Sequence, residues 1–186
     1  ELYLIRHTTP EIAKGVCYGQ SDIGVAASFD DELALLRAKL PLAPAVIYSS
    51  PSQRCLKLAT AIAGDWPIQQ DPRLMELHFG QWELRHWDDI PREQLDAWAN
   101  AYVDHAPPGG ETFRAMHVRV AAFLHELREI SCDAPVIVVT HGGVIRAMLA
   151  EALQLPLTEA FRFQLDFAGV TQLLLRQKLE IGYINR

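Results

Sequence analysis

Two histidines and two arginines stand at or shortly beyond the ends of three short apolar runs. Arg6 and His7 follow the first run, Arg54 comes soon after the second, and His141 follows the third. A guanidinium group offers a fixed fork of donors that matches phosphoryl oxygens, and an imidazole can act as a nucleophile. If the three runs meet in the fold, these side chains form a site for a phosphoryl group.

The three runs, residues 2–5, 45–48 and 135–140, predict short buried strands. The third is apolar without alternation, which is typical of a central strand covered on both faces. Weaker strand patterns occur near Ile68 and over residues 170–175 and 181–184. Because parallel strands present their carboxyl ends at one edge, where open α/β sheets bind ligands, we expect the arginines and histidines to converge there.

Helical spacing of apolar residues follows the second and third runs, so a strand, a polar turn and a helix occur twice. In the first case Ser50 predicts an N-cap, Pro51 the first helical position and Gln53 a capping box, with Gly64 at the helix end. The apolar positions that predict helices are Cys55, Leu58, Ala59 and Ile62; Leu95, Trp98, Ala99 and Tyr102; Phe113, Met116, Val120 and Leu127; and Ile145, Met148, Leu149 and Ala152.

These patterns predict an α/β fold of three layers, with a mostly parallel central sheet and helices on both faces. We expect a single domain over residues 1–186, because Pro107-Pro108-Gly109-Gly110 is typical of a rigid turn rather than a linker. An irregular stretch rich in Trp and His predicts a lid or insert around residues 71–112, which is called the lid region below.

Composition narrows the function classes. Of the 186 residues, 49% are hydrophobic and 22% are charged, which excludes a disordered chain, and the net charge of −6 without a basic cluster argues against a nucleic-acid partner. No run approaches the roughly 20 apolar residues of a membrane span. Cys17, Cys55 and Cys132 lack CxxC spacing, and no HExxH or Cys/His quartet appears. We therefore expect a cytoplasmic protein that binds no membrane and no metal.

Four segments resemble the motifs of the histidine phosphatase, or phosphoglycerate mutase-like, superfamily. Residues 4–8 are similar to its opening Arg-His-Gly signature and residues 49–54 to its second-arginine motif. Residues 76–83 resemble its acidic loop and residues 140–146 its second-histidine motif. Any one of these residues taken alone would be read as an ordinary polar residue at a strand end, but four motifs in family order favour the functional interpretation.

The resemblance implies a role for each residue. His7 would attack phosphorus and be transiently phosphorylated, while Arg6, Arg54, His141 and the Gly142 backbone would hold the phosphoryl oxygens. Such fixed donors stabilise the transition state electrostatically, so the resemblance implies no cofactor.

Three further positions are implicated by the motifs. Thr8 stands where the family usually has glycine, and we expect its hydroxyl to contact the phosphate, with loss of activity as the alternative. Gln20, within residues 15–22, is expected among the substrate-binding residues. Glu76 would protonate the leaving alkoxide and then deprotonate water, although Glu83 lies in the same loop and stays an alternative.

The remaining aromatic residues and histidines receive ordinary interpretations. We expect packing roles for Trp82, Trp87 and Trp98, with ligand contact by Trp82 or Trp87 as the alternative. The histidines expected on the surface or on helix faces are His78, His86, His105, His117 and His125.

Residues 15–22 and 79–86 are similar to the alpha-ribazole phosphatase branch of that superfamily, whose members remove the 5′-phosphate of alpha-ribazole phosphate during cobalamin assembly. The resemblance implies a small phosphomonoester as substrate and a monomer or homodimer. A phosphoglycerate mutase-type transferase, a broad-specificity phosphatase and a non-catalytic binding module are the alternatives. The short chain favours hydrolysis, because a mutase must exclude water from its phosphoenzyme.

Overall fold

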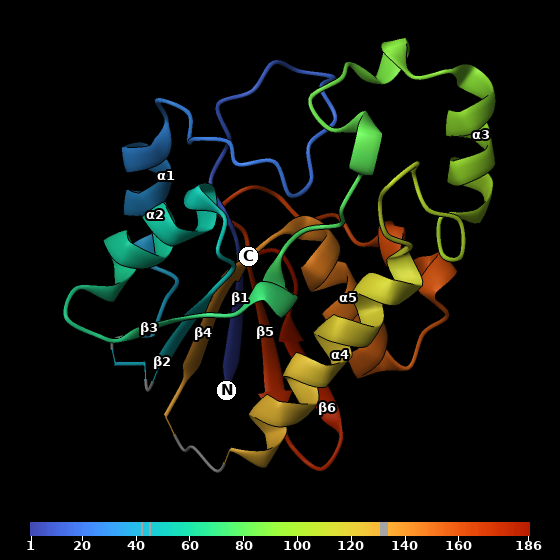
Figure 1. Ribbon diagram of the computed structural model, residues 1–186. Helices are drawn as coiled ribbons and strands as arrows, with labels where there is room; N and C mark the ends of the chain where they lie inside the picture. Colours follow the sequence, from blue (N-terminus) through green and yellow to red (C-terminus); the bar gives the residue numbers. More distant parts are fainter. Residues whose placement is uncertain (42, 45, 131–133) are drawn as a thin grey trace.

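The strands of the fold form one sheet in the order β3-β2-β4-β1-β5-β6 (Figure 1). The computed structural model describes residues 1–41, 43–44, 46–130 and 134–186. Strands β1 to β4 pair in parallel, and among the described strands only β5 runs against the others. The predicted α/β class with a mostly parallel sheet is confirmed. The strands are β1 (Leu2–Arg6), β2 (Val46–Ser49), β3 (Ile68–Gln70), β4 (Val136–Thr140), β5 (Val170–Leu175) and β6 (Leu179–Tyr183).

The strand predictions are right to within two residues at each end. The first residue predicted for β2, Ala45, lies outside the described residues, as does Cys132. Strand β6 begins at Leu179, two residues before the predicted start, because β5 and β6 form a hairpin in which Leu179 pairs with Leu175.

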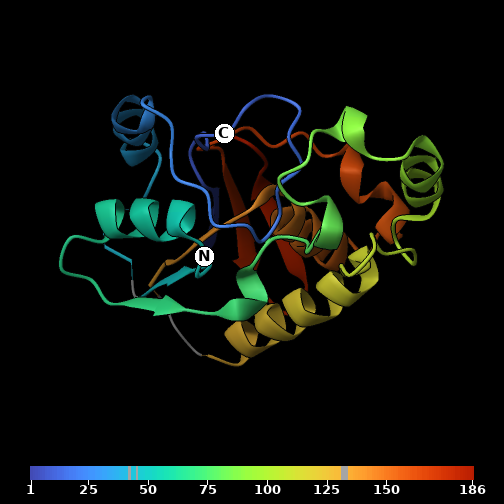
Figure 2. The ribbon, with the colours of Figure 1, turned by 45° about the horizontal axis from the view of Figure 1, so that its top comes forward.

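Helices cover both faces of the sheet, so the predicted three layers are present (Figure 2). Side chains alternate along a strand, so Leu2 and Leu4 of β1 pack with α4 and α5, whereas Tyr3 and Ile5 pack with α1 and α2. Both faces of β4 are buried, as its unbroken apolar run predicts. The helices are α1 (Phe29–Arg37), α2 (Gln53–Ala63), α3 (Arg92–Ala101), α4 (Phe113–Glu129) and α5 (Gly142–Leu153), with short 3-10 helices η1 (Pro72–Leu74), η2 (Gly80–Trp82), η3 (Trp87–Asp89) and η4 (Leu157–Arg162).

The predicted start of α2 is wrong. The helix begins at Gln53 with Ser52 at the N-cap position, and no side chain caps it. The hydroxyl of Ser50 instead lies 2.8 Å from the His141 ring and 3.3 Å from the Ser52 hydroxyl. The predicted end at Gly64 is confirmed, because Gly64 has a φ of 55°.

Helix α1 was not predicted from the sequence. Its buried residues Phe29, Leu33 and Leu36 follow helical spacing. Acidic residues fill its first turn and Arg37 its last, which suits the helix dipole. These two signals together would have identified it.

Two segments lie for most of their length over the carboxyl ends of β1 and β4, at the top of Figure 1. They are the loop of residues 7–28, called the β1–α1 loop, and the lid region. Backbone hydrogen bonds join them, from Cys17 to Arg85, from Leu84 to Cys17 and from Trp87 to Gly15.

The predicted turn at residues 107–110 is present within the lid region. The Gly110 amide donates to the Pro107 carbonyl at 2.8 Å, and Gly109 has a φ of 70°. The Pro108 carbonyl accepts from the Gln81 amide, which ties this turn to η2.

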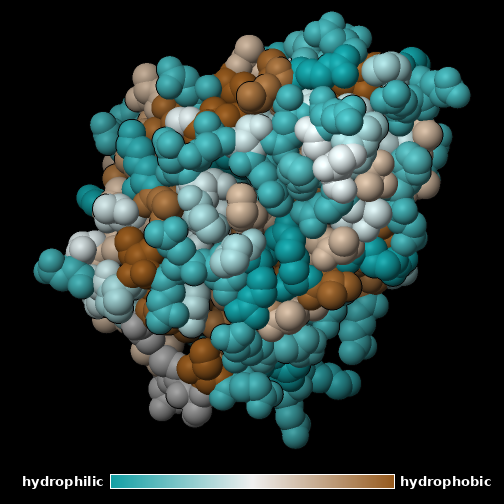
Figure 3. Space-filling model, viewed as in Figure 1, coloured by the Kyte–Doolittle hydropathy of each residue, from teal (hydrophilic) through white to brown (hydrophobic). Residues whose placement is uncertain are grey.

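Hydrophobic residues on the face seen in Figure 3 form small separate areas within a largely hydrophilic surface. None of the helices in the described part of the chain is long and apolar enough to cross a membrane.

Candidate active site

The ends of β1, β2 and β4 deliver the predicted residues to one place. Arg6 stands beside Thr140 in the parallel register, and the His7 amide donates to the Thr140 carbonyl at 3.0 Å. The rings of His7 and His141 therefore meet edge to face, with their centroids 5.2 Å apart. Arg54, in the first turn of α2 beyond β2, reaches the same point, because its Nη2 lies 3.2 Å from Nδ1 of His141.

His7 is buried and its ring orientation is fixed. Its Nδ1 lies 2.7 Å from the carbonyl oxygen of Thr8, which can only accept, so Nδ1 carries the proton and Nε2 keeps a free lone pair. Burial, followed by the charges of Arg54 and Arg6, lowers the pKa of His7 to about 3, although the hydrogen bond to Thr8 acts in the opposite direction. The imidazole is neutral near pH 7, which is the form that a nucleophile requires.

Arg54 is completely buried and is held by the β1–α1 loop. Its Nη1 donates to the Ser21 carbonyl at 2.9 Å and its Nη2 to the Gly19 carbonyl at 2.6 Å. Arg6 donates through Nη1 to the Leu165 carbonyl, and its guanidinium carbon lies 3.8 Å from the ring centroid of Phe167. Both charges are therefore fixed in position before any ligand binds.

Three buried donors beside His7 have no hydrogen-bond partner. They are Nε of Arg6, Nε of Arg54 and the hydroxyl of Thr8. Among the described residues only one further buried side-chain atom, Nε1 of Trp98, shares this property. Buried polar groups are nearly always paired. Unpaired donors on Arg6 and Thr8, the chain neighbours of a neutral imidazole, and on Arg54, whose charge acts on that imidazole, therefore indicate a site for an anion with several acceptor oxygens.

His141 is also buried and neutral, because burial together with the charges around it lowers its pKa well below the usual value. Arg54 can only donate, so Nδ1 of His141 accepts, and its Nε2 donates to the Ser50 hydroxyl at 2.8 Å. Both ring nitrogens thus have protein partners. Sequence reasoning did not identify Ser50 as the partner of this histidine.

Glu76 reaches the site from the lid region, over the start of α5. Its carboxylate accepts from the Leu77 amide at 2.9 Å and from the Gly143 amide at 3.1 Å. A side chain at Gly143 would overlap the Glu76 carboxylate, so glycine is what permits this approach. Gly142 likewise leaves room for two guanidiniums, because an added Cβ would lie 3.0 Å from Arg146 Nη1 and 3.4 Å from Arg6 Nε.

Glu83 occupies a different position, where it ties two loops together. Its carboxylate accepts from the amides of Gln20, Ser21 and Phe79 and from the Ser21 hydroxyl. Burial raises the pKa of Glu83, but these hydrogen bonds together outweigh burial and lower it. Glu83 is therefore a carboxylate whose oxygens are already engaged.

Gln20 lies beside Glu76 rather than on the cavity wall. Its Nε2 donates to the Glu76 carbonyl at 3.0 Å, and its amide donates to Glu83. A substrate-binding role for Gln20 stays a prediction.

A cavity of about 180 Å³ opens beside His7, between the lid region and the start of α5. Arg6, Glu76 and Arg146 supply its charged groups. Most of the wall is apolar or aromatic, formed by Val16, Tyr18, Leu77, Phe79, Trp87, Phe113, Met116 and Phe161.

The tryptophans divide between the two interpretations. Trp82 is buried in a small core with Cys17 and Ile90, so packing describes it fully. Trp87 packs against the same core and also lines the cavity, as the alternative interpretation allowed.

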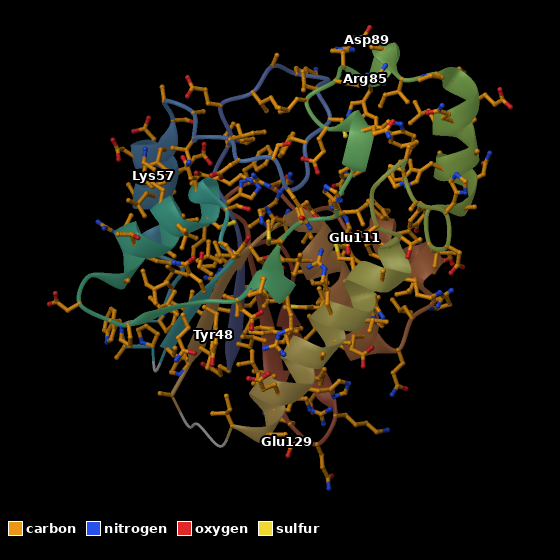
Figure 4. The ribbon with its side chains drawn as sticks, in the orientation of Figure 1. Tyr48, Lys57, Arg85, Asp89, Glu111 and Glu129 are labelled. Carbon is orange, nitrogen blue, oxygen red and sulfur yellow. The ribbon has the colours of Figure 1, made fainter. Side chains whose placement is uncertain are left out.

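A larger cavity of about 350 Å³ lies at the opposite end of the strands, beside Tyr48 and Glu129 in Figure 4, and it contains none of the predicted site residues.

Arg146 lines the cavity beside His7, and sequence reasoning missed it. Its Nε donates to the Phe163 carbonyl at 3.1 Å, and burial lowers its pKa, with Arg6 as a further cause. No carboxylate forms an ion pair with it in the described part of the chain. Arg146 lies four residues after Gly142, and this helical spacing was the signal that could have placed it on the site face of α5.

Fold and site together define an α/β protein whose strand ends hold a neutral buried histidine among fixed guanidinium donors. The chain belongs to the histidine phosphatase superfamily (branch 1), whose family model matches residues 2–180. The expected family is confirmed.

Named relatives cover nearly the whole chain. It is 29% identical to the adenosylcobalamin/alpha-ribazole phosphatase of Escherichia coli, over 89% of this chain and 85% of the relative. It is also 29% identical to a Hydrogenobacter thermophilus protein named "Putative phosphoserine phosphatase 2", over 100% of this chain and 95% of that relative. The crystal structure of the alpha-ribazole phosphatase from Shigella flexneri superposes with a TM-score of 0.92 at 25% identity, covering 100% of this chain and 96% of the other.

Proposed function

We propose that the protein hydrolyses phosphomonoesters of alcohols that carry an aromatic group, with alpha-ribazole 5′-phosphate as the preferred substrate, through a phosphohistidine on His7. The observation that carries the proposal is a neutral, buried His7 whose chain neighbours Arg6 and Thr8 each have an unpaired buried donor, as does the nearby Arg54. A phosphoryl group presents the several acceptor oxygens that these donors lack.

The first proposed step forms a bond between Nε2 of His7 and phosphorus while the bond from phosphorus to the ester oxygen breaks. Glu76, protonated at that point, gives its proton to the departing alkoxide, and the alcohol leaves. Arg6, Arg54 and the Gly142 backbone hold the phosphoryl oxygens throughout.

In the second step Glu76 takes a proton from water, and the resulting oxygen attacks phosphorus. The bond from phosphorus to Nε2 breaks, inorganic phosphate leaves, and His7 and protonated Glu76 are restored. Two fixed guanidinium charges already balance the phosphoryl oxygens, so the proposed reaction uses no metal ion.

The wall of the cavity supports an aromatic alcohol as leaving group. Phe79 and Trp87 meet edge to face with centroids 5.6 Å apart, and both line the cavity together with Phe113 and Phe161. Such a wall favours a flat apolar group of the size of a substituted benzimidazole, which the alpha-ribazole phosphatase relatives suggest.

A second candidate substrate is a phosphomonoester that carries a carboxylate, such as phosphoserine. The observation that favours it is Arg146, a guanidinium on the cavity wall that forms no ion pair with a described carboxylate. A carboxylate beside the phosphate would supply that partner.

A panel of phosphomonoesters tests the proposal. Phosphate release would be measured for alpha-ribazole 5′-phosphate, phosphoserine, 3-phosphoglycerate and p-nitrophenyl phosphate. We expect the highest kcat/KM for alpha-ribazole 5′-phosphate. A higher value for phosphoserine would select the second candidate, whereas transfer of phosphate between positions of 3-phosphoglycerate without release would identify a mutase.

A further inference from the structure

The segment that carries Glu76 has no regular structure between η1 and η2, yet its backbone is held at several points by one side chain of α4. Arg119 donates through Nη1 to the carbonyls of Arg73 and Met75, both at 2.7 Å, and through Nη2 to the Glu76 carbonyl at 3.1 Å. Hydrogen bonds from a charged donor are the strong ones. This guanidinium thus holds three backbone carbonyls, up to and including that of Glu76, to which Gln20 also donates.

Glu111 completes this arrangement from the other side. Its carboxylate pairs with the Arg119 guanidinium, and it accepts from the His78 amide at 3.1 Å. Both side chains are about one-fifth exposed, so solvent screens the pair far less than an ion pair on the surface. In Figure 4 Glu111 lies near the amino-terminal end of α4, where the Glu76 segment passes.

We infer that Arg119 and Glu111 are positioning residues that hold the Glu76 carboxylate against the start of α5, ready for proton transfer. The inference rests on the proposed function for the identity of the proton donor. Backbone on either side of Glu76 is fixed by this pair, and the hydrogen bond from Gly143 then aims the carboxylate. Proton transfer depends on placement within hydrogen-bond reach, so loss of the pair should act on the step that Glu76 serves.

The first test compares Arg119→Ala with Arg114→Ala. Arg114 is a matched control, because it also joins α4 to the lid region, through Asp104, but that pair is more than half exposed. Turnover would be measured with glycerol phosphate, whose alkoxide needs a proton, and with p-nitrophenyl phosphate, whose leaving group does not. We expect Arg119→Ala to lower kcat about 10- to 100-fold on the alkyl ester and only a few-fold on the aryl ester.

Two further variants separate positioning from simple loss of stability. A destabilised enzyme would lose both activities in equal proportion, whereas positioning changes their ratio. In a Glu76→Gln background, Arg119→Ala should leave that ratio unchanged, since the group on which Arg119 acts has been removed. Arg119→Lys keeps the positive charge but not the forked set of guanidinium donors. Its ratio of the two activities should therefore lie between that of Arg119→Ala and that of the wild type.

A second measurement does not depend on turnover. The amide resonance of Gly143, which donates to Glu76, should shift and exchange faster with solvent in Arg119→Ala and stay unchanged in Arg114→Ala. An unmoved Gly143 resonance, or equal losses on the two esters, would overturn the inference. A wild-type protein that releases phosphate from no ester would instead overturn the proposed function, while the Gly143 resonance would still decide whether Arg119 places Glu76.

Discussion

At the scale of single residues, the environment of His7 sets its reactivity. Its protonated Nδ1 donates to the backbone carbonyl of Thr8, which leaves Nε2 unprotonated. We predict that His7→Ala abolishes turnover and that the wild-type enzyme forms a phosphoenzyme that is labile in acid and stable in base. Rapid quenching with labelled substrate checks this. Ordinary turnover in the variant would contradict the covalent mechanism.

Glu76 and Glu83 are seven residues apart and have different surroundings. The Glu76 carboxylate lines the cavity and accepts one backbone amide on each oxygen, whereas the Glu83 carboxylate does not line the cavity and accepts two hydrogen bonds on each oxygen. We predict that Glu76→Gln costs on the order of 10²- to 10⁴-fold in kcat on an alkyl phosphate and far less on an aryl phosphate.

Glu83→Gln is the matched variant for this prediction. It removes the charge of the carboxylate that joins the β1–α1 loop to the lid region by hydrogen bonds. It should therefore lower kcat on both esters in the same proportion. Leaving-group dependence that appeared in Glu83→Gln would show that the acid has been misassigned.

At the scale of elements, the start of α5 brings Glu76 and the phosphate donors together. A methyl group at position 143 would overlap the Glu76 carboxylate, which lies against the first turn of the helix. We predict that Gly143→Ala folds normally, since alanine favours helix, but reproduces the leaving-group dependence of Glu76→Gln. Parallel measurements of thermal unfolding and of kcat on the two esters check this. If the ratio of kcat on the two esters in the variant equalled that of the wild type, Glu76 would not need its close approach to the first turn of α5.

The lid region and the β1–α1 loop form the second functional element. They meet through backbone pairs at Gly15 and Cys17 and through the Glu83 carboxylate. Figure 4 places Arg85 and Asp89 on the outer rim of the lid region, away from the strand ends. Its inner side instead carries Phe79 and Trp87 to the cavity, so we propose that this element selects the substrate. That it opens and closes as a lid stays a prediction.

At the scale of the whole molecule, two neutral histidines buried in one site make folding depend on pH. The unfolded chain binds a proton at His7 below its ordinary pKa of 6.5, whereas the folded chain does so only near 3. The contribution of neutral His7 to the free energy of unfolding is therefore complete above pH 6.5 and is lost as the pH falls toward 3. The free energy of unfolding should fall with acidification through that range.

The variant His7→Asn tests this dependence, since its side-chain amide can still donate to the Thr8 carbonyl but does not titrate. Urea unfolding at about pH 7.5 and about pH 5 should show a smaller loss of stability in the variant than in the wild type. Equal losses in the two proteins would mean that His7 does not keep its depressed pKa in solution.

We also predict catalysis without a metal ion, because arginines on separate elements would supply the required positive charge. Activity should survive exhaustive chelation, followed by assay in metal-free buffer. A strict requirement for an added divalent ion would contradict the proposed mechanism.

The sequence by itself determined the features that depend on the local spacing of residue types. Unbroken apolar runs predicted β1, β2 and β4, periodic apolar residues predicted α2, α4 and α5, and the residues just beyond the strands, His7 and His141, marked the site. Strand ends meet at one edge of any parallel sheet, so these predictions needed no knowledge of packing.

Tertiary structure alone decided the features that depend on which distant groups meet. The proposed choice of Glu76 over Glu83 rests on the partners of each carboxylate, several of which come from residues far away in the chain. The same holds for Ser50, whose hydroxyl binds His141 instead of capping α2, and for Arg119, which reaches the Glu76 segment from α4. Hydrogen bonds and burial are set by proximity in space, which a pattern of residue types along one strand or helix does not encode.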